Sequence, residues 1–267
     1  MADPAALRAH PGEPLDVRAR SLALPPGLAG LEGQRVEFTS RGDRVPARLL
    51  LPPGGHGPFP LVLLQHGAGG SKESDYLDAS AGPWVRGGAA VLSIDFPLHG
   101  ERRSAKLSER LLADLAQPAR AGAAESLWLE VARQAVIDLQ RALDAAATLP
   151  ELDARRVAYA GFSLGTILGA TFLGVDPRPR AAALAVGGGG FGPPAVDPAR
   201  HIGRFAPRPL LFVNATRDET IPRQAAEALF AAAGEPKRME WFDCTHAALP
   251  GRALKAMWLF LREALEI

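Results

Sequence analysis

The chain has 267 residues and a formal net charge of +1, with 47% hydrophobic and 22% charged residues, as in ordinary globular proteins. Its length suits one large α/β domain or two small ones, and without a basic run neither nucleic acid nor an anionic membrane is an expected partner. The single cysteine excludes an internal disulfide, and without a secretory signal or an apolar run of about 20 residues a cytoplasmic location is expected.

The first part of the sequence predicts an N-terminal arm followed by an antiparallel hairpin. Residues 1–33 carry many prolines and are expected to form an arm that lies on the domain. Residues 34–40 and 44–51 alternate polar and apolar side chains on either side of Arg41-Gly-Asp43, a pattern typical of a β-hairpin.

Short apolar runs alternate with helical segments after the hairpin. Such runs, bounded by Gly and Pro, are typical of parallel strands covered on both faces, and a last strand follows them. The predicted strands are residues 60–65, 89–95, 156–161, 181–187, 209–214 and 237–243. The predicted helices are residues 126–149, 164–173, 222–233 and 249–265. This alternation predicts a single α/β domain over residues 34–267, with a mostly parallel eight-stranded sheet flanked by helices.

Residues 100–125 do not fit the regular alternation. They carry charge and a weak helical signal, and they stand between a strand and the longest helix. In this topology the segment would lie at the carboxyl edge of the sheet, where ligands bind. We therefore expect a lid at this position, and the alternative is a surface insertion without a catalytic role.

The sequence around Ser163 carries the strongest functional signal. A β-favouring run leads into Gly161-Phe-Ser163-Leu-Gly165, and a helix-compatible run follows. This pattern is typical of a nucleophile elbow, a sharp strand-to-helix turn that presents a serine hydroxyl at the top of a sheet. The turn strains the serine backbone and leaves no room for side chains at its flanks, which explains the two glycines.

Further motifs accompany the elbow along the chain. They are His66-Gly-Ala-Gly-Gly70, Asp95-Phe-Pro-Leu-His-Gly100, Leu152-Asp-Ala-Arg-Arg-Val157, Asp218-Glu-Thr-Ile-Pro222 and Thr245-His246. With these motifs, over roughly residues 34–265, the chain resembles the α/β-hydrolase fold superfamily. Within it, the chain resembles dienelactone-hydrolase-like enzymes, acetyl esterases and prolyl-oligopeptidase-like peptidases. Dienelactone hydrolases proper use a cysteine nucleophile, so the serine in this elbow favours the esterases.

In that fold an acid and then a histidine follow the serine along the chain, and this order indicates the partners of Ser163. Only His201 and His246 lie beyond Ser163, and His246 is expected to be the base because it follows the last strand. Asp218, on the loop after the strand at 209–214, is expected to orient the base; it could instead cap the next helix. The competing acids are Asp176, Asp197 and Asp243.

Two backbone N–H groups are expected to form an oxyanion hole. One belongs to Leu164, which follows the nucleophile at the helix N-terminus. By resemblance to the His-Gly-x pattern, the other belongs to Ala68, with Gly69 as the alternative. His66 is expected to hold this loop by hydrogen bonds rather than to transfer protons.

The substrate pocket is predicted less directly than the catalytic residues. Phe96, Phe162 and Phe191 follow or flank the catalytic loops and are expected to line it. No pair of histidines or cysteines has zinc spacing, and neither a metal nor a cofactor is expected.

The resulting hypothesis is a serine hydrolase that cleaves small to medium carboxylic esters through an acyl-enzyme intermediate. The alternatives are a peptidase or amidase, an acyltransferase, and a non-catalytic binding protein that retains the fold. The sequence leaves the oligomeric state open.

Overall fold

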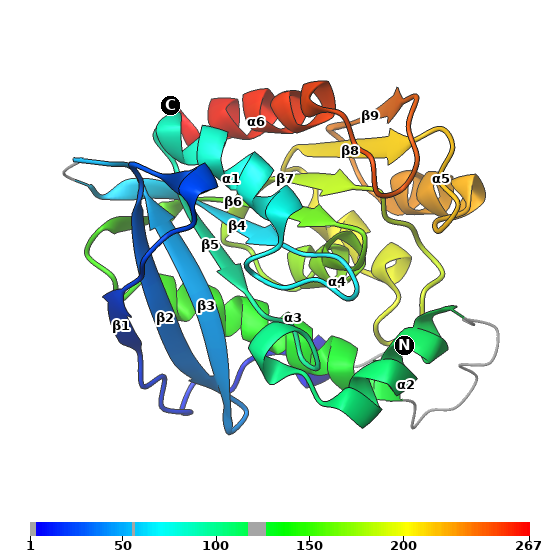
Figure 1. Cartoon of the computed structure of the whole chain (residues 1–267). Helices are drawn as coiled ribbons and strands as arrows, with labels where there is room; N and C mark the ends of the chain where they lie inside the picture. Colours follow the sequence, from blue (N-terminus) through cyan, green and yellow to red (C-terminus); the bar gives the residue numbers. More distant parts are fainter. Residues whose placement is uncertain (1–3, 55–56, 117–126) are drawn as a thin grey trace.

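The computed structural model of the protein describes residues 4–54, 57–116 and 127–267, and it contains a twisted sheet between two layers of helices (Figure 1). The strands are β1 Arg18–Ser21, β2 Glu32–Ser40, β3 Asp43–Leu51, β4 Phe59–Gln65, β5 Ala90–Ile94, β6 Leu152–Phe162, β7 Pro179–Ala185, β8 Leu210–Ala215 and β9 Lys237–Phe242. The helices are α1 Asp75–Arg86, α2 Ala105–Ala116, α3 Leu127–Ala146, α4 Leu164–Leu173, α5 Arg223–Ala232 and α6 Gly251–Leu265.

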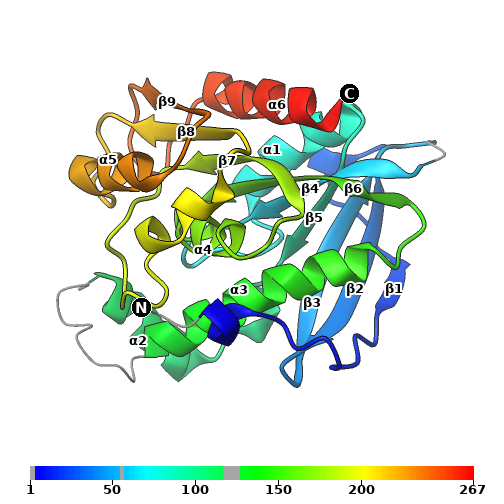
Figure 2. The ribbon, with the colours of Figure 1, turned by 180° about the vertical axis from the view of Figure 1, so that it is seen from behind.

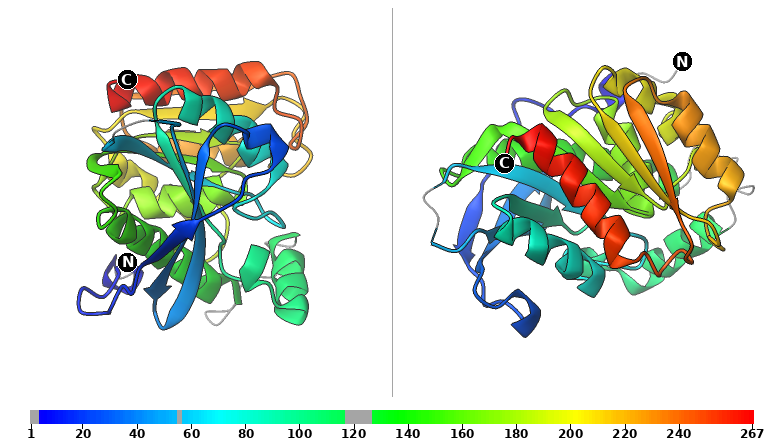
Figure 3. Two further views of the ribbon diagram at one scale, coloured as in Figure 1. Left: turned by 60° about the vertical axis from the view of Figure 1, so that its left-hand side comes forward. Right: turned by 90° about the horizontal axis from the view of Figure 1, so that it is seen from above.

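The strand order in the described sheet is β1-β2-β3-β5-β4-β6-β7-β8-β9. Strands β1, β2 and β3 are antiparallel to their neighbours. The other six strands, β4 to β9, run parallel to one another. Figure 3 shows the N-terminal strands at one end of this sheet and β8 and β9 at the other. The predicted mixed and mostly parallel sheet is thereby confirmed.

The sheet has nine strands rather than the eight that were predicted, because the N-terminal arm contributes β1. All four residues of β1 are exposed, so no apolar alternation signals the strand in the sequence. The arm is also held elsewhere: Leu7 is buried, and its carbonyl accepts a 2.6 Å hydrogen bond from Nε2 of Gln140 in α3.

The hairpin between β2 and β3 turns over two residues. Ser40 pairs with Asp43, and the residues between them, Arg41 and Gly42, have φ values of 49° and 81°. Two positive φ values match the right-handed twist of the flanking strands, and glycine adopts such a value without strain.

The core has two parts, one on each face of the sheet. Helices α1 and α6 cover one face, and α3 and α4 cover the other (Figure 1, Figure 2). The predicted helices at 164–173, 222–233 and 249–265 match α4, α5 and α6 closely. Of the predicted helix at 126–149, residue 126 lies outside the described residues and α3 ends at Ala146. Helix α1 was not predicted, because Pro83 interrupts its sequence pattern.

Strands β4, β6, β7 and β8 end side by side, so the loops that follow them meet at one edge of the sheet. In the register of the ladder, Gln65 at the end of β4 pairs with Gly161, and Phe162 pairs with Ala185 of β7. The carboxyl edge of a parallel sheet is where ligands bind in folds of this class.

Candidate active site

Ser163 sits on a strained turn between β6 and α4. Its φ and ψ are 52° and −109°, a backbone conformation that L residues rarely adopt. A Cβ on Gly161 would lie 2.5 Å from the carbonyl group of Gly165, and a Cβ on Gly165 would lie 2.7 Å from the carbonyl oxygen of Gln65. The two glycines are therefore required by close backbone approach, as the sequence pattern suggests.

Hydrogen bonds from neighbouring elements hold this turn in place. The N–H of Ser163 donates to the carbonyl of Ala185 in β7 at 2.9 Å. The hydroxyl of Tyr159, which is fully buried, donates to the carbonyl of Gly165 at 2.6 Å. The strain at Ser163 thus persists because β7 and the core under α4 determine the backbone around it.

The structure brings His246 and Asp218 into line with Ser163. His246 lies on the loop between β9 and α6, and its Nε2 is 3.0 Å from the Ser163 hydroxyl oxygen. On the other side of the ring, Nδ1 is 2.8 Å from Oδ2 of Asp218. A carboxylate can only accept, so Nδ1 carries the proton, and Nε2 presents a lone pair to the serine hydroxyl.

The carboxylate of Asp218 is itself fixed by its loop. Its Oδ1 accepts the N–H groups of Thr220 at 2.9 Å and Ile221 at 2.7 Å. Helix α5 begins later, at Arg223, and its N-cap residue is Pro222. Asp218 therefore closes a turn and orients the imidazole, whereas capping of α5, the alternative reading of this residue, does not occur.

The competing residues have other partners. Asp176 pairs with Arg178, Asp197 caps a short 3-10 helix, and Asp243 pairs with Arg217 at the surface. His201 is buried, and the distance from its Nε2 to the carbonyl oxygen of Ala195 is 3.0 Å. In the described part of the chain, none of these groups forms a hydrogen bond with Ser163, whose hydroxyl contacts His246.

The residues predicted for the oxyanion hole lie on either side of Ser163. Leu164 is the first residue of α4, where backbone N–H groups have no partner within the helix. Ala68 lies in the loop after β4 and lines both cavities next to the serine. This loop lies against Ser163, since a Cβ on Gly67 would lie 3.3 Å from the Cβ of Ser163.

Tyr76 is a residue of the site that the sequence analysis missed. It stands at the start of α1, the helix that was not predicted, and lines the cavity next to Ser163. The N–H of Gly67 donates to its hydroxyl oxygen at 2.7 Å, and its ring packs edge-on against Phe162. Desolvation of its hydroxyl raises the pKa of Tyr76, which keeps the group protonated at neutral pH, and Ser74 lies within hydrogen-bonding reach of the same hydroxyl.

His66 holds the loop after β4 to the loop after β5. The N–H of Phe96 donates to its Nε2 at 3.2 Å, so Nδ1 carries the proton and donates to the carbonyl of Gly67 at 2.8 Å. Burial lowers the pKa of His66 to about 4, which keeps the ring neutral at physiological pH. These bonds are of the kind that was predicted for this residue.

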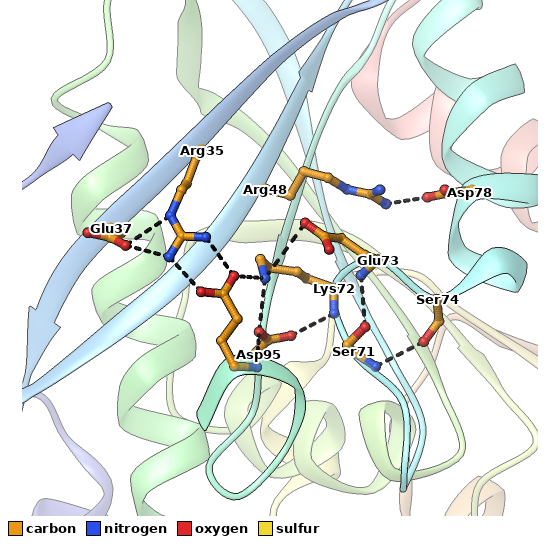
Figure 4. A network of polar contacts seen from close by, with 10 residues as sticks. Arg35, Glu37, Arg48, Ser71, Lys72, Glu73, Ser74, Asp78 and Asp95 are labelled. Carbon is orange, nitrogen blue, oxygen red and sulfur yellow. Dashed lines mark hydrogen bonds and ion pairs between the residues drawn. The ribbon is translucent and has the colours of Figure 1, made fainter. Parts of the chain in front are cut away.

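A network of ion pairs includes Lys72, which belongs to the loop after β4 (Figure 4). The ammonium of Lys72 is buried and donates to Oδ2 of Asp95 at 3.0 Å and to Oε1 of Glu101 at 2.6 Å. The guanidinium of Arg35 in β2 makes two 2.6 Å bonds to Glu101 and also pairs with Glu37. The bonds from Arg35, followed by those from Lys72, lower the pKa of Glu101 to about 2. The network ties the loop that carries Ala68 to β2 and to the segment that leads into α2.

Two cavities meet at Ser163. The smaller, of about 230 Å³, is lined by Phe162 and His246, and the larger, of about 590 Å³, is lined by Phe191 and by Leu115 of α2. Helix α2 falls within the segment predicted as a lid, the last part of which, 117–125, lies outside the described residues.

Phe96 does not have the position that was predicted for it. Its side chain is fully buried, its ring centroid lies 4.9 Å from that of His66, and it lines neither cavity. The residue lies two positions after the end of β5, and its N–H donates to His66.

Within residues 4–54, 57–116 and 127–267, no group of three or more His, Cys, Asp or Glu side chains is arranged to hold a metal ion. Among the described helices, none is long and apolar enough to cross a membrane.

Comparison with solved structures gives extensive matches at low sequence identity. An acetyl xylan esterase from a Paenibacillus species matches with a TM-score of 0.74 and 21% identity, over 94% of this chain and 89% of that one. A cold-adapted esterase from an Arctic intertidal metagenomic library matches with a TM-score of 0.71 and 20% identity, over 92% and 97%. The chain has the α/β-hydrolase fold.

Other proteins of this fold match equally widely. An acetyl xylan esterase from a Thermoanaerobacterium species has a TM-score of 0.70 and 17% identity, over 96% of this chain and 91% of that one. A structure described as a dienelactone hydrolase from Klebsiella pneumoniae has a TM-score of 0.65 and 16% identity, over 94% and 98%. No protein-family model and no curated protein matches the sequence. The α/β-hydrolase fold is therefore shared with esterases, whereas the activity has to be argued from the site.

Proposed function

We propose that this protein is a serine hydrolase that cleaves carboxylic esters of small to medium size through an acyl-enzyme intermediate. The observation that carries the proposal is the unbroken line from Ser163 through His246 to Asp218, with distances of 3.0 Å and 2.8 Å. An imidazole that carries its proton on Nδ1 and directs the lone pair of Nε2 at the serine hydroxyl is arranged to act as a general base.

In the first half of the reaction, the oxygen of Ser163 attacks the ester carbonyl carbon while its proton passes to Nε2 of His246. The carbonyl oxygen becomes an oxyanion, which the N–H groups of Leu164 and Ala68 receive. The tetrahedral intermediate collapses, the bond to the leaving oxygen breaks, and His246 returns the proton to the departing alcohol.

In the second half, a water molecule gives its proton to His246 and its oxygen attacks the acyl carbon. The bond to Ser163 then breaks, the proton returns to the serine, and the acid leaves. Asp218 stabilises the imidazolium that forms twice in this cycle.

The two cavities suggest where each half of the ester lies. His246 must reach the leaving oxygen to protonate it, and it lines the smaller cavity of about 230 Å³. We therefore assign the alcohol to the smaller cavity and the acyl group to the larger one of about 590 Å³. The volume of the larger cavity lies within the range of sites that bind small molecules.

The test is hydrolysis of a p-nitrophenyl ester series, from acetyl to palmitoyl, by the wild-type protein and by Ser163→Ala. The expected result is an optimum at short or medium acyl chains, together with a loss of about 10⁴-fold or more in kcat for the variant. Circular dichroism of both proteins controls for the fold. A fluorophosphonate that labels Ser163 in wild type while esters are not cleaved would favour amide substrates; an unlabelled Ser163 would favour a binding protein.

A further inference from the structure

The larger cavity combines an apolar lining with one charged side chain. Leu115, Ile167, Phe191 and Ile221 supply apolar surface, and several further positions are glycine or alanine. Among the described residues that line it, Glu219 alone has an ionisable side chain. Of the described residues, an acyl group that enters this cavity therefore meets one carboxylate among mainly apolar side chains.

Within residues 4–54, 57–116 and 127–267, no lysine or arginine neutralises this carboxylate. Within the described residues, Glu219 takes part in no salt bridge with lysine or arginine, and its Oε2 accepts a 3.3 Å hydrogen bond from the N–H of His246. The residue is exposed, so the carboxylate keeps part of its hydration and remains available to a ligand.

The position of Glu219 is fixed by the residue before it. The loop from 218 to 221 is closed by the bonds from Thr220 and Ile221 to Asp218, which in turn holds His246. The backbone at Glu219 is thus held at a constant place relative to Ser163, and its exposed carboxylate extends from this fixed loop.

We propose that Glu219 sets the charge preference of the acyl site. The site then favours esters whose acyl group ends in a cation over esters with a neutral acyl group, and it disfavours acyl groups that end in a carboxylate. The inference rests on the proposed ester hydrolysis. A cation in the cavity is attracted by the carboxylate and can also contact the face of Phe191, whereas an anion is repelled and loses hydration. Partial exclusion of water from the cavity makes this interaction stronger than the same pair in bulk solvent.

The experiment compares two esters of equal shape. p-Nitrophenyl 4-(trimethylammonio)butanoate carries a positive charge where p-nitrophenyl 5,5-dimethylhexanoate carries a neutral carbon. The quantity measured is the ratio of their kcat/KM values, charged over neutral, for wild type and Glu219→Gln. Any change in the basicity of His246 affects both esters alike and cancels in this ratio.

The expected result is a ratio that falls about five- to tenfold in Glu219→Gln and further in Glu219→Lys. Glutamine can still accept the N–H of His246, so the loop is retained. In wild type the ratio should also fall with rising salt concentration, because mobile ions screen the carboxylate. Glu263→Gln is the matched control, since it removes the same charge from an exposed position of α6, where no salt bridge with a described residue is formed and which lies outside the described lining of both cavities.

Two negative results have different meanings. A ratio that stays the same in Glu219→Gln and Glu219→Lys, while the neutral ester is still hydrolysed, overturns the role of Glu219 and leaves the proposed function intact. Failure of the wild-type protein to hydrolyse the neutral ester or any member of the p-nitrophenyl series overturns the proposed function and this inference together.

Discussion

The Nδ1 atom of His246 lies 2.8 Å from Oδ2 and 3.0 Å from Oδ1 of Asp218, so both carboxylate oxygens face the ring nitrogen. The contact joins the loop after β8 to the loop after β9, and the two residues are 28 positions apart in the sequence. An imidazole held in this way keeps one tautomer, and only that tautomer can take the proton of Ser163.

Asp218→Asn should lower kcat for the best ester by about 10³- to 10⁴-fold, because an amide NH₂ facing Nδ1 favours the wrong tautomer. Thr220 and Ile221 can still donate to the amide oxygen, so the melting temperature should change little. The measurements are steady-state kinetics and thermal unfolding followed by circular dichroism. A kcat within tenfold of wild type would remove Asp218 from the mechanism.

Gly165→Ala should destabilise the protein by about 2 kcal/mol or more, because the new Cβ would lie 2.7 Å from the carbonyl oxygen of Gln65, a backbone atom that cannot move aside alone. Gly251→Ala is the control, since no atom lies within 4 Å of its added Cβ and the residue begins α6. It should be neutral or slightly stabilising. Urea unfolding of both variants gives the comparison, and equal stability would contradict the close approach.

Lys72→Met should destabilise the protein by about 3–5 kcal/mol, because the fully buried carboxylate of Asp95 would lose its charge partner. The double variant Lys72→Met/Asp95→Asn removes both charges and should recover a large part of this loss. A double-mutant cycle by urea unfolding measures the coupling between them. Additive losses would show that the pair does not interact in the folded state.

Stability should fall as the pH is lowered from about 6.5 toward 4, because burial holds the pKa of His66 at about 4 while the unfolded chain binds its proton at 6.5. Above 6.5 both states are neutral, and below 4 both are protonated, so the loss lies in this window. Between about pH 7 and about pH 5, His66 alone should account for roughly 2 kcal/mol. Burial also lowers the pKa of His99 and His201, which adds loss of the same sign.

His66→Gln isolates this contribution, since glutamine can bond the loop without titrating. The free energy of unfolding, measured in urea at both pH values, should fall less in the variant than in wild type. Both pH values lie above 4.5, the ordinary pKa of a glutamate. The pKa of Glu101 is about 2 in the folded protein, so its contribution to stability is lost only as the pH falls below 4.5. Parallel curves for variant and wild type would contradict the assignment.

The features that the sequence could predict are those with a local cause. The elbow is one: Gly161, Ser163 and Gly165 are dictated by the geometry of a single turn, and the residues around them show it. The buried strands are another, because apolar runs between turn residues follow from burial on both faces. The order and type of these elements were therefore predicted, and the structure confirms the sheet that they form.

What the sequence did not show depends on contacts between distant segments. Strand β1 is exposed along its whole length, and it pairs with β2 in an antiparallel ladder that no local pattern indicates. Tyr76 enters the site because α1 brings its hydroxyl to the N–H of Gly67, and Pro83 obscures that helix. Phe96 was expected to line the pocket because it stands close to a predicted catalytic loop in the sequence. Its side chain is instead buried against His66.

The exposed strand β1 also has a consequence for how the molecule behaves at high concentration. An outer strand offers unpaired N–H and C=O groups, which can extend the sheet into another copy of the chain. Here that strand is four residues long and carries Arg18 and Arg20, and it shields the nine-residue β2. Short length and positive charge make it a poor template for intermolecular pairing, so residues 18–21 protect the protein against aggregation through this edge.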